Sequence, residues 1–131
     1  MTTEISDSSS GKRVFVVEDD VIISRLLQHL FERRGYDVRM AGDGQAALRL
    51  IESGEIPALV ILDLMLPFMD GFELIDRIRR KPVWADVPVI MLTSKSQEHN
   101  IVRALDAGAT DYVIKPFQPD ELMARVRRFI K

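Results

Sequence analysis

Residues 58–63, Ala-Leu-Val-Ile-Leu-Asp, decide the fold, because five apolar residues in a row end abruptly in a carboxylate. An uninterrupted apolar run of this length is typical of a strand that is buried on both faces, as in a parallel sheet. A second run, residues 14–17, ends in the same way at Glu18 and Asp19. The carboxyl ends of parallel strands lie along one edge of a sheet, where ligand sites form. Three acids meeting there repel one another unless a cation lies among them, so this edge predicts a divalent metal site beside Asp63.

Apolar runs alternate with amphipathic stretches along the rest of the chain. The pattern predicts strands over 13–18, 37–41, 58–63, 88–93 and 111–115, and helices over 20–34, 44–53, 71–81, 97–107 and 119–131. Strict alternation indicates an α/β fold, in which five helices cover both faces of a doubly wound, five-stranded parallel sheet as a three-layer sandwich. Gly35, Gly54 and Gly108 are expected to end three of the helices.

Length and composition exclude several classes of protein. The 131 residues suffice for one domain, which we expect over 12–131 after a polar, Ser-rich and disordered tail over 1–11. A net charge of −2 gives no indication of direct nucleic-acid contact, and the absence of cysteine excludes disulfides and thiolate metal sites. No apolar run approaches the ~20 residues of a membrane span. We therefore expect a cytoplasmic protein that makes no membrane contact.

Polar side chains stand at four predicted strand ends, namely Glu18 with Asp19, Asp63, Thr93 and Lys115. Each suits one role in phosphoryl transfer to a carboxylate. Asp63 is the candidate nucleophile, because a carboxylate attacks phosphorus to form an acyl phosphate. Glu18 and Asp19, with a carboxylate oxygen of Asp63 and the backbone carbonyl of Met65, are the candidate ligands of Mg²⁺. Lys115 and the Thr93 hydroxyl are the candidate partners of the phosphoryl oxygens.

Five segments in this order resemble the receiver domain of bacterial two-component response regulators: VVEDD at 16–20, LDLMLPFMDG at 62–71, VIMLTS at 89–94, GATDY at 108–112 and KPF at 115–117. The resemblance implies a flavodoxin-like strand order of 2-1-3-4-5. It also implies that Asp63 accepts a phosphoryl group from a histidine kinase or phosphotransfer protein. A cis peptide bond between Lys115 and Pro116 belongs to the same family pattern.

The resemblance further implies a switch, in which Thr93 moves toward the phosphoryl group and Tyr112 turns inward. This would repack the surface made by the fourth helix, the fifth strand and the fifth helix, and so control an output domain or a partner. In receivers of the winged-helix transcription-factor type, the positions of Asp111 and Arg125 pair across a homodimer. Other charges of that set are absent, since residue 101 is Ile and residue 107 is Ala, so a homodimer on phosphorylation stays an open expectation.

Three positions lie where the family varies, namely Met65, Phe68 and Lys95. An apolar Met65 does not orient an attacking water, which favours slow autodephosphorylation. Phe68 places a bulky ring where small or polar residues are frequent, and it is expected to shield the acyl phosphate or to contact a partner.

Alternative readings depend on single residues. A phosphatase of the haloacid dehalogenase type needs a second acid two residues after its nucleophile, and that position is Met65. A flavodoxin needs a hydroxyl- and glycine-rich phosphate loop after the first strand, where acids stand instead. A receiver-like interaction module that works without phosphorylation remains the alternative. Asp20 is assigned to the helix start, and His29 and His99 to the surface.

Overall fold

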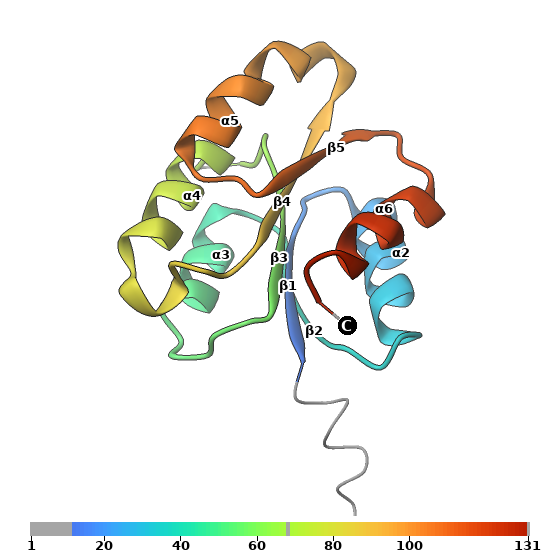
Figure 1. The fold of residues 1–131 in the computed structure, drawn as a ribbon, viewed down its shortest axis with the longest axis horizontal. Coiled ribbons are helices and arrows are strands. Elements are labelled where there is room, and N and C mark those ends of the chain that lie inside the picture. Colours follow the sequence, from blue (N-terminus) through green and yellow to red (C-terminus); the bar gives the residue numbers. More distant parts are fainter. Residues whose placement is uncertain (1–11, 68, 131) are drawn as a thin grey trace, which may run out of the picture.

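The chain folds around a five-stranded parallel sheet in a computed structural model that describes residues 12–67 and 69–130. The strands follow the order β2-β1-β3-β4-β5, with parallel pairing throughout (Figure 1). This confirms both the predicted sheet and the predicted strand order. The strands are β1 (Arg13–Val17), β2 (Asp37–Ala41), β3 (Leu59–Asp63), β4 (Val89–Ser94) and β5 (Asp111–Lys115).

Five α-helices cover the two faces of the sheet. Sheet and helices together make three layers (Figure 1). Two of the helices, α2 (Val21–Glu32) and α6 (Pro119–Arg127), lie on one face. The opposite face carries α3 (Gly44–Ile51), α4 (Gly71–Arg80) and α5 (Ile101–Ala107). A short 3₁₀ helix, η1 (Pro82–Trp84), precedes β4. Among the described residues, no helix is long and apolar enough to cross a bilayer.

The predicted fourth helix differs from the observed one at its beginning. We expected it from residue 97, but residues 95–100 form the 3₁₀ helix η2 (Lys95–Asn100), and α5 begins only at Ile101. The physical reason lies in the sequence Lys-Ser-Gln-Glu-His-Asn, which has no apolar residue to hold an α-helical turn against the sheet. The other elements begin and end within a few residues of the predicted bounds.

Local signals explain where several helices begin and end. The Asp20 carboxylate accepts hydrogen bonds from the backbone N–H groups of Ile22 and Ile23, at 2.9 and 3.1 Å, and so caps α2. This confirms its assignment to the helix start. Gly108 ends α5 with a φ of 120°, a left-handed conformation that glycine adopts without the penalty of a Cβ. Gly35 and Gly54, which follow α2 and α3, also have positive φ.

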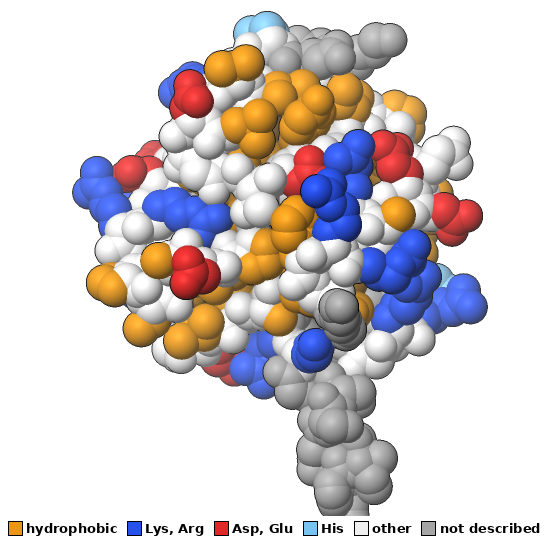
Figure 2. All heavy atoms as spheres, in the orientation of Figure 1, with side chains coloured by type: hydrophobic (Ala, Val, Ile, Leu, Met, Phe, Trp, Pro, Cys, Tyr) orange, Lys and Arg blue, Asp and Glu red, His pale blue; other side chains and the backbone are white. Residues whose placement is uncertain are grey.

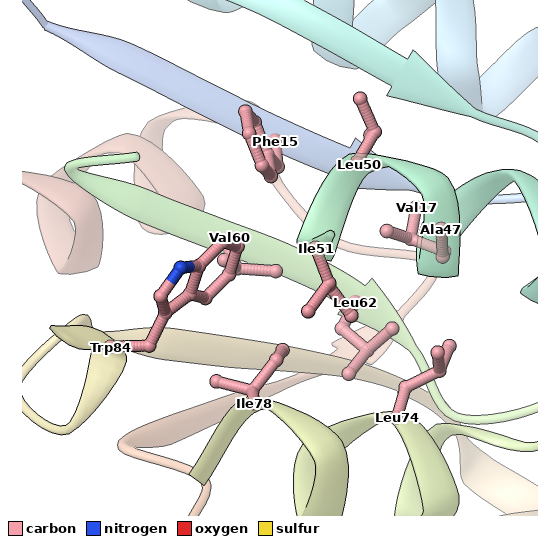
Figure 3. A pocket seen from close by; sticks show the side chains of 10 residues that line it. All are labelled: Phe15, Val17, Ala47, Leu50, Ile51, Val60, Leu62, Leu74, Ile78 and Trp84. Carbon is pink, nitrogen blue, oxygen red and sulfur yellow. The ribbon is translucent and has the colours of Figure 1, made fainter. Parts of the chain in front are cut away.

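Two hydrophobic cores lie on the two faces of the sheet. Side chains of β1 alternate between them, with Phe15 and Val17 on the α3, α4 and α5 side and Val14 and Val16 on the other. Figure 3 shows side chains of the first core around a cavity, with Trp84 near Phe15. The volume of this cavity is only about 10 Å³. The ring centroids of these two residues lie 5.7 Å apart. Dense packing on both faces holds the strands, and therefore their carboxyl ends, in fixed positions.

Candidate functional site

The sheet brings the predicted site residues to one edge. Strands β1 and β3 are neighbours with Val17 opposite Leu62, so the residues that follow, Glu18 and Asp63, lie side by side. In β4, Leu92 stands opposite Asp63, and Thr93 comes directly after it. Lys115 is the last residue of β5 and lies opposite the last residue of β4. Four strand ends therefore converge on one place.

Three carboxylates form the centre of this site. One oxygen from each of Glu18, Asp19 and Asp63 lies within 4.8 Å of the other two. Glu18 and Asp63 are buried, with 1% and 3% of their surface exposed, whereas Asp19 faces the solvent. Mg²⁺ prefers oxygen ligands and keeps several of its waters, so a group of carboxylates that is open to water on one side suits it. The residues present therefore fit a magnesium ion.

Lys115 supplies the one cation that contacts these acids within the described residues. Its Nζ lies 3.3 Å from Oε1 of Glu18 and 3.3 Å from Oδ2 of Asp63. The peptide bond between Lys115 and Pro116 is cis, as the resemblance implied. Three carboxylates and one ammonium leave a formal excess of two negative charges when all four are ionised, and one divalent cation balances that excess.

Burial changes the proton affinity of these groups. It raises the pKa of Glu18 to about 7, helped by the Asp63 carboxylate and opposed by the N–H of Asp20, which donates to Glu18 Oε2 at 3.0 Å. Burial also raises the pKa of Asp63, although Lys115 opposes that shift. Burial by itself lowers the pKa of Lys115, but the carboxylates of Asp63 and Glu18 outweigh it and raise that pKa. The Lys115 ammonium and the two carboxylates therefore favour each other's charged forms, whereas burial and the nearby Asp63 carboxylate disfavour the charged form of Glu18.

Met65 lies beside the candidate phosphoacceptor. Its backbone N–H donates to Oδ1 of Asp63 at 3.3 Å, while its side chain is 56% exposed.

The predicted switch residues, Thr93 and Tyr112, lie close together. The Thr93 hydroxyl donates to the carbonyl of Ser94 at 3.3 Å. Thr93 also lines a cavity of about 10 Å³ together with the half-buried ring of Tyr112. The two predicted switch residues thus border one small space. Phe68 and the side chain of Lys95 lie outside the part of the chain that the structure describes.

Two features of the site were not predicted from the sequence. The first is Gly71, which the sequence analysis names only as the end of a motif. A Cβ at this position would lie 2.9 Å from the carbonyl oxygen of Asp63, so glycine lets α4 begin directly against the end of β3.

The second feature is the position of Arg125, which the family resemblance paired with Asp111 across a dimer. In this structure the two residues pair within one chain at 3.1 Å, and Arg125 also reaches Glu121 at 3.3 Å.

Comparisons with known proteins agree with this geometry. A sequence profile described as the response regulator receiver domain matches residues 14–127. The alkaline phosphatase synthesis transcriptional regulatory protein PhoP of Bacillus subtilis is 43% identical over 121 residues, which make up 92% of this chain and 49% of that protein. The chain spans about half the length of the curated relatives it matches.

Solved structures give the same result. The receiver domain of a Francisella response regulator is 34% identical, with a TM-score of 0.80 over 90% of this chain and 95% of that chain. The receiver domain of a sensor histidine kinase from Pseudomonas aeruginosa is 29% identical, with a TM-score of 0.82 over 91% of this chain and 97% of that chain. That structure has a magnesium ion coordinated in its active-site cleft. Sequence profile, relatives and fold agree, and the chain belongs to the response regulator receiver domain family.

Proposed function

We propose that this chain is a phosphorylation-controlled signalling switch whose phosphoacceptor is Asp63. The observation that supports this most directly is the position of the Asp63 carboxylate, which is buried beside Lys115 and within 4.8 Å of two other acids. One oxygen of Asp63 attacks the phosphorus of a phosphohistidine on a histidine kinase or phosphotransfer protein. The new O–P bond forms as the P–N bond breaks, and the electron pair stays on the leaving nitrogen.

Within this proposal, Glu18, Asp19, a carboxylate oxygen of Asp63 and the backbone carbonyl of Met65 hold Mg²⁺. When bound, the ion neutralises negative charge between the carboxylate and the incoming phosphoryl oxygens. Lys115, which already contacts Asp63 at 3.3 Å, donates to a phosphoryl oxygen after transfer. The Thr93 hydroxyl, whose only acceptor in the described residues is the Ser94 carbonyl, turns to donate to another phosphoryl oxygen. The apolar side chain of Met65 orients no water, which supports slow loss of the phosphoryl group.

The proposed output surface consists of α5, β5 and α6. Thr93 and Tyr112 border the same cavity, so movement of the Thr93 hydroxyl toward Asp63 makes room for the Tyr112 ring. Figure 2 shows hydrophobic side chains gathered above β5, in the upper part of the view. This apolar surface is available for contact with a partner. The PhoP relative is named a transcriptional regulator. We therefore propose an output domain or a partner protein as the target, and homodimerisation through this surface on phosphorylation.

Intact mass after incubation with acetyl phosphate, with and without Mg²⁺, tests the proposal. We expect wild type to gain one phosphoryl group only with Mg²⁺, and Asp63→Asn to gain none. Asp70→Asn is the matched control, since the Asp70 side chain only caps α4 by accepting from the N–H of Glu73 at 3.0 Å, and asparagine caps equally well. No gain in wild type would contradict the proposal and leave a phosphorylation-independent interaction module.

A further inference from the structure

Arg79, near the carboxyl end of α4, joins two distant loops. Its Nε donates to the carbonyl of Gly108 at 3.0 Å, and its Nη1 donates to the carbonyl of Val87 at 2.8 Å. Longer contacts reach the carbonyls of Trp84 and Ala85, at 3.1 and 3.3 Å, and the hydroxyl of Thr110 at 3.4 Å. Hydrogen bonds from a charged donor are among the stronger ones in proteins, so the loss of this guanidinium would remove several such contacts at once.

These contacts hold the carboxyl end of α5. Gly108 ends that helix, and a Cβ at Gly108 would lie 2.8 Å from Cγ of Arg79, so the arginine stem packs directly on this residue. Two residues later, the N–H of Thr110 donates to the carbonyl of Val89 at 2.8 Å, and its hydroxyl accepts from the N–H of Val89 at 2.9 Å. The end of α5 is therefore tied to both α4 and the beginning of β4.

Among the side chains that the structure describes, fewer contacts hold the amino end of α5. Asn100 precedes the helix without a side-chain capping bond, and Ala104 is the one residue of α5 that is buried. Asn100, Ile101 and Ala104 cover the small cavity that Thr93 and Tyr112 line. The Arg103 guanidinium lies 3.9 Å from the centroid of the Phe72 ring of α4, and because Arg103 is exposed, this cation–π contact is a weak one.

We infer that Arg79 is the fixed end of the switch: α5 swings about Gly108, with its amino end moving over the cavity beside Thr93 and Tyr112. The inference rests on the proposed function, because Thr93 and Tyr112 supply the motion. The phosphorylation site lies at the carboxyl ends of the strands, next to the amino end of α5, whereas Arg79 acts at the opposite end of the helix. A helix hinged in this way converts a small movement at Thr93 into a rotation of its exposed residues.

Spin-label distances test the inference, and the chain has no native cysteine to interfere. One label at Arg49→Cys in α3 is paired either with Val102→Cys near the amino end of α5 or with Asp106→Cys near its carboxyl end; all three positions are exposed. On phosphorylation with acetyl phosphate and Mg²⁺, we expect the 49–102 distance to change by about 1–2 Å and the 49–106 distance by less than half of that. Equal changes at both positions, or none at either with Asp63 phosphorylated, overturn the inference.

Two arginine variants test the role of the anchor. In Arg79→Met we expect the 49–106 distance to change as much as the 49–102 distance. Arg80→Met, the matched control, loses a side chain that is 77% exposed and pairs with Asp76 on its own helix, and it should behave as wild type. An unchanged difference between the two positions in Arg79→Met overturns the role of Arg79. If Arg79→Met does not fold, the comparison of the 49–102 and 49–106 distances in the protein that retains Arg79 still tests whether α5 swings about Gly108.

Intact mass of each labelled sample separates the two proposals. A labelled sample that gains a phosphoryl group on Asp63 but moves α5 as one body leaves the proposed function standing and removes the hinge. A sample that gains none overturns the proposed function, and the hinge with it.

Discussion

Glu18 shows how one buried residue determines the electrostatics of the site. It accepts from the N–H of Asp20 and contacts Lys115, and its own backbone carbonyl accepts from the Ser24 hydroxyl at 3.0 Å. These contacts hold the Glu18 side chain in place. Burial, however, disfavours the ionised form of its carboxyl group and raises the pKa of Glu18 from 4.5 to about 7. Without a metal ion, the folded protein therefore holds this carboxyl group in its protonated form over a range where the unfolded chain ionises it.

The stability of the metal-free protein should consequently depend on pH through Glu18. Between about pH 4.5 and 7 the folded state binds more protons at this residue than the unfolded state, so its contribution to the free energy of unfolding falls as pH rises. Urea unfolding in EDTA, compared between wild type and Glu18→Gln, isolates this contribution. We expect the stability of wild type relative to Glu18→Gln to decrease across this window and to level off above it. A relative stability that increases with pH would contradict the raised pKa.

At the scale of elements, the backbones of β3 and α4 pack closely against each other where the two elements meet at the site. The N–H of Gly71 donates to the carbonyl of Leu64 at 2.8 Å. A Cβ at Gly71 would approach the Asp63 carbonyl oxygen and Leu64 Cα to 2.9 Å, both of them backbone atoms that cannot rotate away. The start of α4 and the position of Asp63 are therefore coupled.

Gly71→Ala should accordingly destabilise the protein by about 1–3 kcal/mol and slow phosphorylation, because α4 or the backbone of Asp63 must shift. Gly42→Ala is the matched control, since a Cβ at Gly42 meets nothing within 4 Å. Urea unfolding measures the first effect, and the rate of mass gain with acetyl phosphate measures the second. Equal behaviour of the two alanine variants would show that the junction tolerates the extra methyl group.

At the scale of the whole molecule, the acidic edge of the sheet couples folding to metal binding. The three carboxylates come together only when β1 and β3 pair, so the unfolded chain has no comparable site. A ligand that binds only the folded state stabilises it, by about 2.7 kcal/mol at a free concentration of one hundred times its Kd. Folding and the proposed Mg²⁺ binding should therefore reinforce each other.

Added Mg²⁺ should raise the Tm of wild type in a concentration-dependent way, and Asp19→Asn should weaken that response by removing one carboxylate ligand. Asp20→Asn provides a neighbouring control with the same chemical change, because Asp20 caps α2 and asparagine replaces it in that role. Differential scanning calorimetry over a Mg²⁺ series measures both. A response that Asp20→Asn reduces as much as Asp19→Asn would place the ion elsewhere.

The amino-acid sequence by itself determined the strands, their burial and the acids at their ends. Continuous apolar runs such as residues 58–62 are typical of strands covered on both faces, and parallel strands align their carboxyl ends by topology. The resemblance of the quoted motifs then added the strand order and the cis bond before Pro116, both of which the structure contains. Roles of Asp63, Thr93, Lys115 and Tyr112 in transfer and switching stay predictions.

Only the tertiary structure decided which side chains meet. Lys115 contacts Glu18 across 97 residues of sequence, and Arg79 reaches Gly108 across 29. Asp111 and Arg125 occupy positions that pair across a dimer in some receivers, but here they form an ion pair with each other within one chain. Such contacts are made or lost when packed elements shift by less than an ångström, and no periodicity or spacing in the sequence encodes positions to that precision. The sequence therefore predicts where the chemistry lies, and the packing determines how it is held.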